Sequence, residues 1–363
     1  MPLQYRTIFF IFKYIRLILI PLSPLYLIIF YFKRHIQNGK KKFNIPIICI
    51  GNITTGGTGK TPTVIYIAKL LREKGYKPGI ISRGYGGTKS KKGGIVTDGA
   101  NILLTPEESG DEPYLMAKKS LNLPIAIGKN RIISINNLIQ KHNVDIIIMD
   151  DGFQNNTIYK DISIITIDAI NPFGNGLILP AGDLREPKSS LKRSHLLLIS
   201  KSNLIPATDL IVLSKRIQKI IGHNFIFNSI YKITYIYQIN NSKKTYPVTM
   251  LEGKKILLIT AIGNPKGLIK TVKKLNPDNI SCLFYPDHYN FIQKNIEKFI
   301  KKSKYFDYVI LTEKDYVKVK KFSFTNKFYI LNMSLNIENE EYFELHLAKI
   351  INRCKSGQRE YLW

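Results

Sequence analysis

Short apolar runs alternate with amphipathic helical patterns along most of this chain. In the first part, apolar runs predict strands at residues 79–82, 94–97, 124–127, 145–149, 161–167 and 195–199. Apolar residues at helical spacing predict helices at 60–74, 112–120, 131–142 and 207–221. Strand–helix alternation is typical of an α/β fold, with a mostly parallel sheet and helices on both faces.

The alternation breaks at residues 225–250, where two apolar-rich stretches flank a polar turn. This pattern predicts a two-stranded connector at 225–252. A second, smaller α/β pattern follows, with strands at 255–260, 280–285, 307–311 and 328–332 and helices at 266–275, 292–303 and 339–353. We therefore predict a P-loop domain at 43–224 and a C-terminal α/β domain at 253–363.

An apolar segment at residues 7–32 precedes the first domain. Its least interrupted part, 17–32, is close to the lower limit for a membrane span of about 20 residues, and prolines at 21 and 24 interrupt it. Basic residues follow the segment and favour a cytoplasmic location for the rest of the chain. The pattern predicts a membrane-anchor segment at 1–42, either spanning or partly inserted, and a buried helix of a soluble protein is the alternative.

Composition narrows the possible partners. The chain is 44% hydrophobic and 11% aromatic, which indicates a folded protein. Its net charge of +28 favours anionic partners, and because no nucleic-acid-binding motif is present, we expect a membrane surface and no nucleic acid. Cys49, Cys282 and Cys354 are far apart, which argues for a reducing compartment and against a zinc site.

Residues 47–62 combine an apolar run, a glycine-rich turn and the start of a helical pattern. Such a strand–loop–helix binds phosphates, because glycines let several backbone N–H groups converge on one anion and the helix adds its positive end. Lys60 would reach the β/γ-phosphates and the Thr61 hydroxyl would ligate Mg²⁺. The strict phosphate-loop pattern has a glycine at position 54, where this chain has Thr54. An ordinary glycine-rich turn is therefore the alternative. The candidate nucleotide-binding residues are Thr54, Thr55, Gly56, Gly57, Thr58, Gly59, Lys60 and Thr61.

A second apolar run, 144–149, ends in the carboxylates Asp150 and Asp151. In a P-loop protein, a carboxylate at this strand end orders Mg²⁺ or its water shell. Adjacent side chains on a strand point to opposite sides, so we expect the two aspartates to have different roles, without assigning which one faces the metal. A polar turn after a buried strand is the alternative.

Other charged groups stand beside flexible backbone. Arg83 and Tyr85 lie in a glycine-rich stretch after a strand, which suits either an anionic ligand or a structural turn. Arg185 and Glu186 share a loop, where the arginine could neutralise phosphate and the glutamate could reach a metal, or the two could form a surface ion pair. Arg131 opens a helix after a strand and is a further phosphate candidate.

Two stretches carry candidate bases. Asp111, followed by Glu112, precedes a helical run and is either a helix cap or a general base. His288 follows Asp287 after a predicted strand of the second domain, and ligands of α/β proteins bind at such carboxyl ends. The stretch 312–315 ends the next strand and would line the same cleft.

Together these stretches resemble the tetraacyldisaccharide 4′-kinase (lipid A 4′-kinase) family over nearly the whole chain. Six motifs occur in the family's order, at 51–62, 82–87, 110–113, 150–154, 184–186 and 287–289. Their order is far more specific than any single motif. The family's phosphate loop also departs from the strict spacing, which accounts for Thr54.

The resemblance implies two α/β domains, a two-stranded connector and an N-terminal membrane helix. It implies transfer of the γ-phosphate of ATP to the 4′-hydroxyl of a tetraacylated disaccharide 1-phosphate lipid, on the cytoplasmic face of a bacterial inner membrane. Asp111 and His288 correspond to the family's base dyad. We expect Mg²⁺ to bind Thr61 with Asp150 or Asp151, and Glu186 is a further candidate. Arg83, Arg131 and Arg185 are expected to contact phosphate, with Tyr85 and Glu112 beside the substrate.

Two other classes of protein compete with this interpretation. One is a membrane-associated P-loop ATPase switch, a class that resembles this chain but carries a signature lysine before the two glycines, where Thr55 stands. The other is a GTPase or nucleotide-dependent metal chaperone. Residues 312–315 do not match a guanine-reading motif, and the sequence has no Cys/His cluster for a metal cargo.

Overall fold

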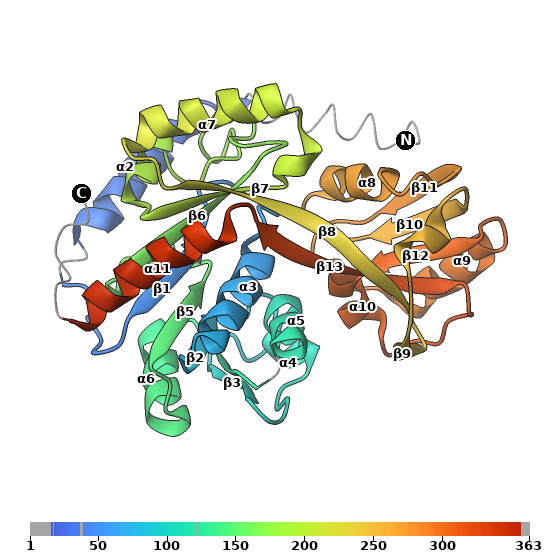
Figure 1. The fold of residues 1–363 in the computed structure, drawn as a ribbon, viewed down its shortest axis with the longest axis horizontal. Helices are drawn as coiled ribbons and strands as arrows, with labels where there is room; N and C mark the ends of the chain where they lie inside the picture. The colour runs from blue at the N-terminus through green and yellow to red at the C-terminus, as the bar shows by residue number, and fades with distance from the viewer. Residues whose placement is uncertain (1–15, 17, 37–38, 121, 357–363) are drawn as a thin grey trace.

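One β-sheet runs through both halves of the molecule (Figure 1). The computed structural model describes residues 16, 18–36, 39–120 and 122–356. Across these residues the sheet has 13 strands, in the order β11-β10-β12-β13-β8-β7-β6-β1-β5-β2-β4-β3, with β9 paired to β8. The fold is therefore α/β with a large, mostly parallel sheet, as the alternating pattern predicts.

The N-terminal half contains the strands β1 (Ile47–Gly51), β2 (Pro78–Ser82), β3 (Gly94–Asp98), β4 (Pro124–Ile127), β5 (Ile146–Asp150), β6 (Ile162–Asp168) and β7 (Leu196–Ser200). Its helices are α3 (Lys60–Glu73), α4 (Pro106–Ser109), α5 (Asp111–Lys119), α6 (Arg131–His142) and α7 (Ala207–Ile221). The strands pair in parallel except β3, which is antiparallel to β4. Every residue of β1 and β5 is buried, as expected for a parallel sheet covered on both faces.

The C-terminal half is built on the parallel strands β10 (Lys255–Thr260), β11 (Asn279–Phe284) and β12 (Tyr308–Thr312). Its helices α8 (Pro265–Lys273) and α9 (Gln293–Ser303) were predicted from their periodicity, whereas the short α10 (Glu313–Val319) was not. Phe299 of α9 and Leu257 of β10 share one of its hydrophobic clusters.

Two long strands connect the halves (Figure 1). The predicted pair in 225–252 is present as β8 (Ile226–Gln238) and β9 (Asn241–Tyr246), which are antiparallel. However, the longest pairing of β8 is with β13 (Phe328–Ile337), which extends five residues beyond the strand predicted at 328–332. Because β8 also pairs with β7, and β13 with β12, these two strands join the halves into one sheet.

The last helix, α11 (Glu340–Lys355), returns to the N-terminal half. Phe343 and Leu347 of α11 belong to the same hydrophobic cluster as Val64 and Ile67 of α3. The predicted domain at 253–363 assigned this helix to the second half. In the structure, β13 carries the chain back across the connection, so the helix packs beside the P-loop helix.

The N-terminal segment enters the structure as α2 (Leu22–Ile36). Tyr26 donates a hydrogen bond to the carbonyl of Arg185 (3.0 Å) and Ser23 to that of Ile178 (2.9 Å). No helix within the described residues has the length and apolarity needed to cross a membrane. Much of the predicted apolar segment, residues 7–15 and 17, lies outside the described residues.

Candidate active site

The loop between β1 and α3 has the backbone shape of a phosphate-binding loop. Gly56 and Gly59 adopt φ angles of 95° and 94°, in the left-handed region that favours glycine. Thr54 instead forms an isolated β-bridge with Leu184, so the loop needs no glycine at 54. Gly59 leads directly into Lys60, the first residue of α3. The predicted strand–loop–helix is present.

Side chains from the ends of β6 and β7 hold this loop. Lys201 donates to the carbonyl of Gly57 (3.1 Å) and pairs with Asp168. Asn264, from the second half, donates to the same Asp168 carboxylate (2.6 Å). We did not single out Lys201 or Asp168 from the sequence. Their position at the carboxyl ends of β6, which pairs with β1, and of the next strand, β7, is the signal that would have found them.

Asp150 ends β5 and Asp151 follows it, and the two side chains lie in different environments, as their adjacent positions predict. Asp150 is buried, and Ser82 donates to its Oδ2 (2.9 Å), whereas its Oδ1 has no hydrogen-bond partner among the described residues. Burial, together with the charges of Glu112 and Asp151, raises the pKa of Asp150 to about 7. Burial opposes ionisation of Asp151 as well, but Lys60 and Arg185 outweigh it and hold the pKa of this carboxyl below its usual value.

The two candidate bases, 177 positions apart in the chain, meet in the structure. Asp111 opens α5, and His288 follows β11 in a left-handed conformation with φ 60°. His288 Nδ1 lies 3.4 Å from Asp111 Oδ2, and the ring of Tyr85 packs edge-on against the His288 ring at 5.3 Å. Burial disfavours the charged form of Asp111, but His288, Lys318 and Lys314 more than offset it and lower its pKa.

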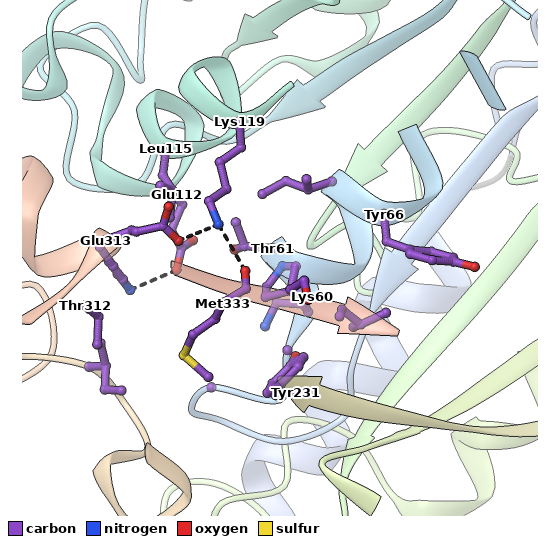
Figure 2. A pocket seen from close by; sticks show the side chains of 18 of the residues that line it. Lys60, Thr61, Tyr66, Glu112, Leu115, Lys119, Tyr231, Thr312, Glu313 and Met333 are labelled. Carbon is purple, nitrogen blue, oxygen red and sulfur yellow. Dashed lines mark hydrogen bonds and ion pairs between the residues drawn. The ribbon is translucent and has the colours of Figure 1, made fainter. Parts of the chain in front are cut away.

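A cleft of about 1410 Å³ connects the phosphate loop with His288. Its walls come from both halves, and Figure 2 shows Lys60 and Thr61 of α3 facing Glu112 of α5, Glu313 of α10 and Met333 of β13. The predicted residues that line the cleft are Gly56, Gly57, Thr58, Gly59, Lys60, Thr61, Arg83, Tyr85, Glu112, Asp150, Asp151, Arg185 and His288.

The predicted residues that do not line the cleft are Thr54, Thr55, Asp111, Arg131 and Glu186, and the last two are held by contacts of their own. Glu186 is fully buried, accepts a hydrogen bond from Gln154 (2.9 Å) and pairs with Arg193. Arg131 is buried and donates to the carbonyl of Gly128 (2.8 Å), and burial lowers the pKa of its guanidinium to about 10. Neither residue lines the cleft, although Gln154 links Glu186 to the carbonyl of Asn52, just before the loop (2.8 Å).

Ion pairs between α5 and α10 close one side of the cleft (Figure 2). Lys119 pairs with Glu313 and donates to the carbonyl of Met333 (3.0 Å), and Lys314 lies 2.9 Å from Glu112. The sequence predicted that residues 312–315 line the cleft. It did not predict α10, which is too short to show a clear helical period, or the ion pairs of α10 with α5, because no local pattern indicates contacts between distant segments.

The fold and the cleft define a P-loop phosphotransferase with a nucleotide loop facing a candidate base. The family model described as tetraacyldisaccharide-1-P 4′-kinase matches residues 15–352. The chain is 34% identical over 282 residues to the tetraacyldisaccharide 4′-kinase of Syntrophus aciditrophicus, covering 75% of each chain. It is 33% identical over 338 residues to that of Legionella pneumophila strain Corby, covering 91% of this chain and 92% of the relative.

A solved structure agrees with these sequence matches. The "apo" form of LpxK from Aquifex aeolicus in complex with ATP has a TM-score of 0.69 and 25% identity, covering 93% of this chain and 99% of that one. This chain belongs to the tetraacyldisaccharide-1-phosphate 4′-kinase family, the ATP-dependent kinases of lipid A biosynthesis.

Proposed function

We propose that this chain transfers the γ-phosphate of ATP directly to the 4′-hydroxyl of a tetraacylated disaccharide 1-phosphate within the described cleft. The observation that carries the proposal is that one cleft joins Lys60, at the N-terminus of α3, to His288, whose imidazole contacts Asp111. Phosphoryl transfer needs little covalent work from the protein, so positioning and charge neutralisation supply most of the rate. Lys60 and the loop amides hold the β/γ-phosphates.

Asp111 accepts the proton of the attacking hydroxyl in this mechanism, and His288 orients its carboxylate. The lowered pKa of Asp111 keeps it ionised and able to accept a proton at neutral pH. Arg83 and Arg185 line the same cleft and supply cations for phosphate groups. Arg185 also pairs with Asp151 (3.1 Å), which keeps the guanidinium beside Lys60.

Mg²⁺ fits the residues at the end of β5. Asp150 Oδ1 is buried and unpartnered among the described residues, and the Thr61 hydroxyl lines the same cleft. Mg²⁺ usually takes one or two protein carboxylates and completes its shell with water and substrate phosphates. The described residues accordingly contain no group of three or more acidic, His or Cys ligands. When bound, the ion neutralises charge on the transferred phosphate.

The membrane is the proposed partner surface of α2. Leu25, Ile28 and Phe32 recur at helical spacing and are 53%, 64% and 65% exposed. Such a face suits insertion into the bilayer interface, and the net charge of +28 adds attraction to anionic lipid. We propose that the protein sits on the cytoplasmic face of a bacterial inner membrane, where its lipid acceptor is found.

Vesicle sedimentation tests this surface. Deleting residues 1–36, or introducing Ile28→Ser with Phe32→Ser, is expected to reduce binding to anionic vesicles at high salt. The matched control is Ile211→Ser with Val212→Ser, which removes exposed apolar side chains of α7 (56% and 66% exposed). Undiminished sedimentation of both α2 variants would contradict the proposed surface.

The activity is tested with purified full-length protein and γ-³²P-labelled ATP. We expect label to appear on a tetraacylated disaccharide 1-phosphate and not on the same lipid lacking its 4′-hydroxyl. ATP hydrolysis should depend on the acceptor. Rapid hydrolysis without an acceptor, and no labelled lipid, would favour the ATPase switch instead.

A further inference from the structure

A buried lysine contacts the candidate base from the second half of the chain. Lys318 lies near the end of α10, and its side chain is 2% exposed. Its Nζ lies 3.5 Å from Asp111 Oδ2 and donates to the carbonyl of Ala261 (3.2 Å). A buried ammonium is costly unless it is paired, so this contact is a specific feature of the site.

The charges around Asp111 come from several elements. His288 contacts it from the loop after β11, and Asp287 in the same loop lies 3.2 Å from Lys314 of α10. Lys314 also pairs with Glu112, which neighbours Asp111 on α5. The Tyr85 phenol and the buried Asp315 carboxyl are further titratable groups near these residues. Lys314 thus has two acidic partners, whereas Lys318 pairs with Asp111 and also acts electrostatically on the buried Asp315 carboxyl.

Both contacts to Asp111 are made on the same oxygen. His288 Nδ1 and Lys318 Nζ each approach Oδ2, and no ion pair to Oδ1 occurs within the described residues. Asp111 keeps 17% of its side chain exposed. The two carboxylate oxygens therefore have different surroundings, because both cations approach Oδ2.

We propose that Lys318 is a positioning residue for phosphoryl transfer, which together with His288 fixes Asp111 through Oδ2 and leaves Oδ1 to take the proton of the sugar hydroxyl. The inference rests on the proposed role of Asp111 as the base. Lys318 does not touch the substrate; it acts through Asp111. An adjacent cation favours the ionised carboxyl, so Lys318 keeps Asp111 deprotonated at lower pH than its burial alone would permit.

The experiment is the pH profile of kcat for Lys318→Met and Lys318→Arg in the full-length enzyme with saturating ATP and acceptor. Lys320→Met is the matched control, because Lys320 also bridges α10 to α5, through the Tyr114 hydroxyl (2.6 Å), without contacting Asp111. ATP affinity is measured in parallel to confirm that the nucleotide site is intact.

We expect Lys318→Met to move the acidic limb of the kcat profile to higher pH, with a several-fold loss of kcat at the acidic end and unchanged ATP affinity. Lys318→Arg should keep the limb near its wild-type position, and Lys320→Met should not move it. An unmoved limb in Lys318→Met would overturn the inference, because loss of a purely structural contact would lower kcat equally at every pH.

Asp111→Asn separates this inference from the proposed function. Wild-type kcat in Asp111→Asn would refute the base itself. A large loss there, with an unmoved limb in Lys318→Met, would refute only the role of Lys318. If Lys318→Met does not fold, the double variant with Asp111→Asn should restore folding, because it removes the carboxylate charge that has lost its ammonium partner. Failure of that rescue would also overturn the pairing.

Discussion

Gly59, the last residue of the phosphate loop, leaves no room for a side chain. A Cβ added there would lie 1.8 Å from the hydroxyl oxygen of Tyr231 and 3.0 Å from its ring carbon Cζ. The φ angle of 94° adds a second obstacle, because left-handed backbone costs a non-glycine residue about 1–2 kcal/mol. Overpacking of this kind typically costs about 1–3 kcal/mol. Gly59→Ala should therefore distort the loop that holds the phosphates.

The two costs can be separated by variants of neighbouring glycines. Gly56 has a φ of 95° but open space around its added Cβ, so Gly56→Ala reports backbone strain alone. Gly57 requires no positive φ, and its nearest neighbouring atom lies 3.7 Å from the added Cβ. We expect the loss of ATP affinity to increase from Gly57→Ala through Gly56→Ala to Gly59→Ala. A combined cost of about 3 kcal/mol corresponds to roughly a hundredfold loss for Gly59→Ala.

Isothermal titration calorimetry with ATP measures these losses, and Tyr231 supplies the decisive control. Its hydroxyl has no hydrogen-bond partner among the described residues, so Tyr231→Phe should have little effect by itself. Added to Gly59→Ala, Tyr231→Phe removes the atom closest to the new Cβ. It should therefore restore the part of the ATP affinity lost to the clash, but not the part lost to backbone strain. ATP affinity within about threefold of wild type in Gly59→Ala, less than about 0.7 kcal/mol, would refute the loop geometry.

Three further predictions concern the charged groups of the cleft. Lys60→Ala should abolish most phosphoryl transfer because Lys60 is the cation that the loop itself presents to the β/γ-phosphates at the start of α3, and near-normal turnover would contradict the P-loop assignment. Asp111→Asn should lower kcat strongly and preserve ATP binding. The double variant with His288→Ala should lose far less kcat than the product of the two single losses, and multiplicative losses would refute a dyad that acts as a unit. In the absence of ATP and Mg²⁺, Asp150 should increase the free energy of unfolding as pH falls through about 7. The reason is that its pKa is about 7 in the folded chain and lower in the unfolded chain, so the folded state binds the proton first. Urea unfolding at several pH values should show this contribution missing from Asp150→Asn; an identical pH dependence in the variant would argue against the raised pKa.

Local pattern determined most individual elements of this protein. The helices predicted at 131–142 and 207–221 have those bounds in the structure, because their apolar residues repeat at helical spacing over at least three turns. The phosphate loop was recognisable for a similar reason, since one short segment contains the strand, the glycines and the first helical turn. The pairing of Asp111 with His288 was predicted from the family resemblance, because the periodicity of helices and strands contains no information on contacts between distant segments.

Only the tertiary structure decided which distant segments meet. The pairing of β13 with β8, the return of α11 to the first core and the environments of Glu186 and Arg131 depend on packing between segments separated by many residues. Lys318 had no distinguishing local pattern among the many lysines of the chain, and its burial against Asp111 arises because α10 packs on α5. Sequence periodicity shows which face of an element is buried, but the partner of that face is chosen by the shape and charge of the whole fold.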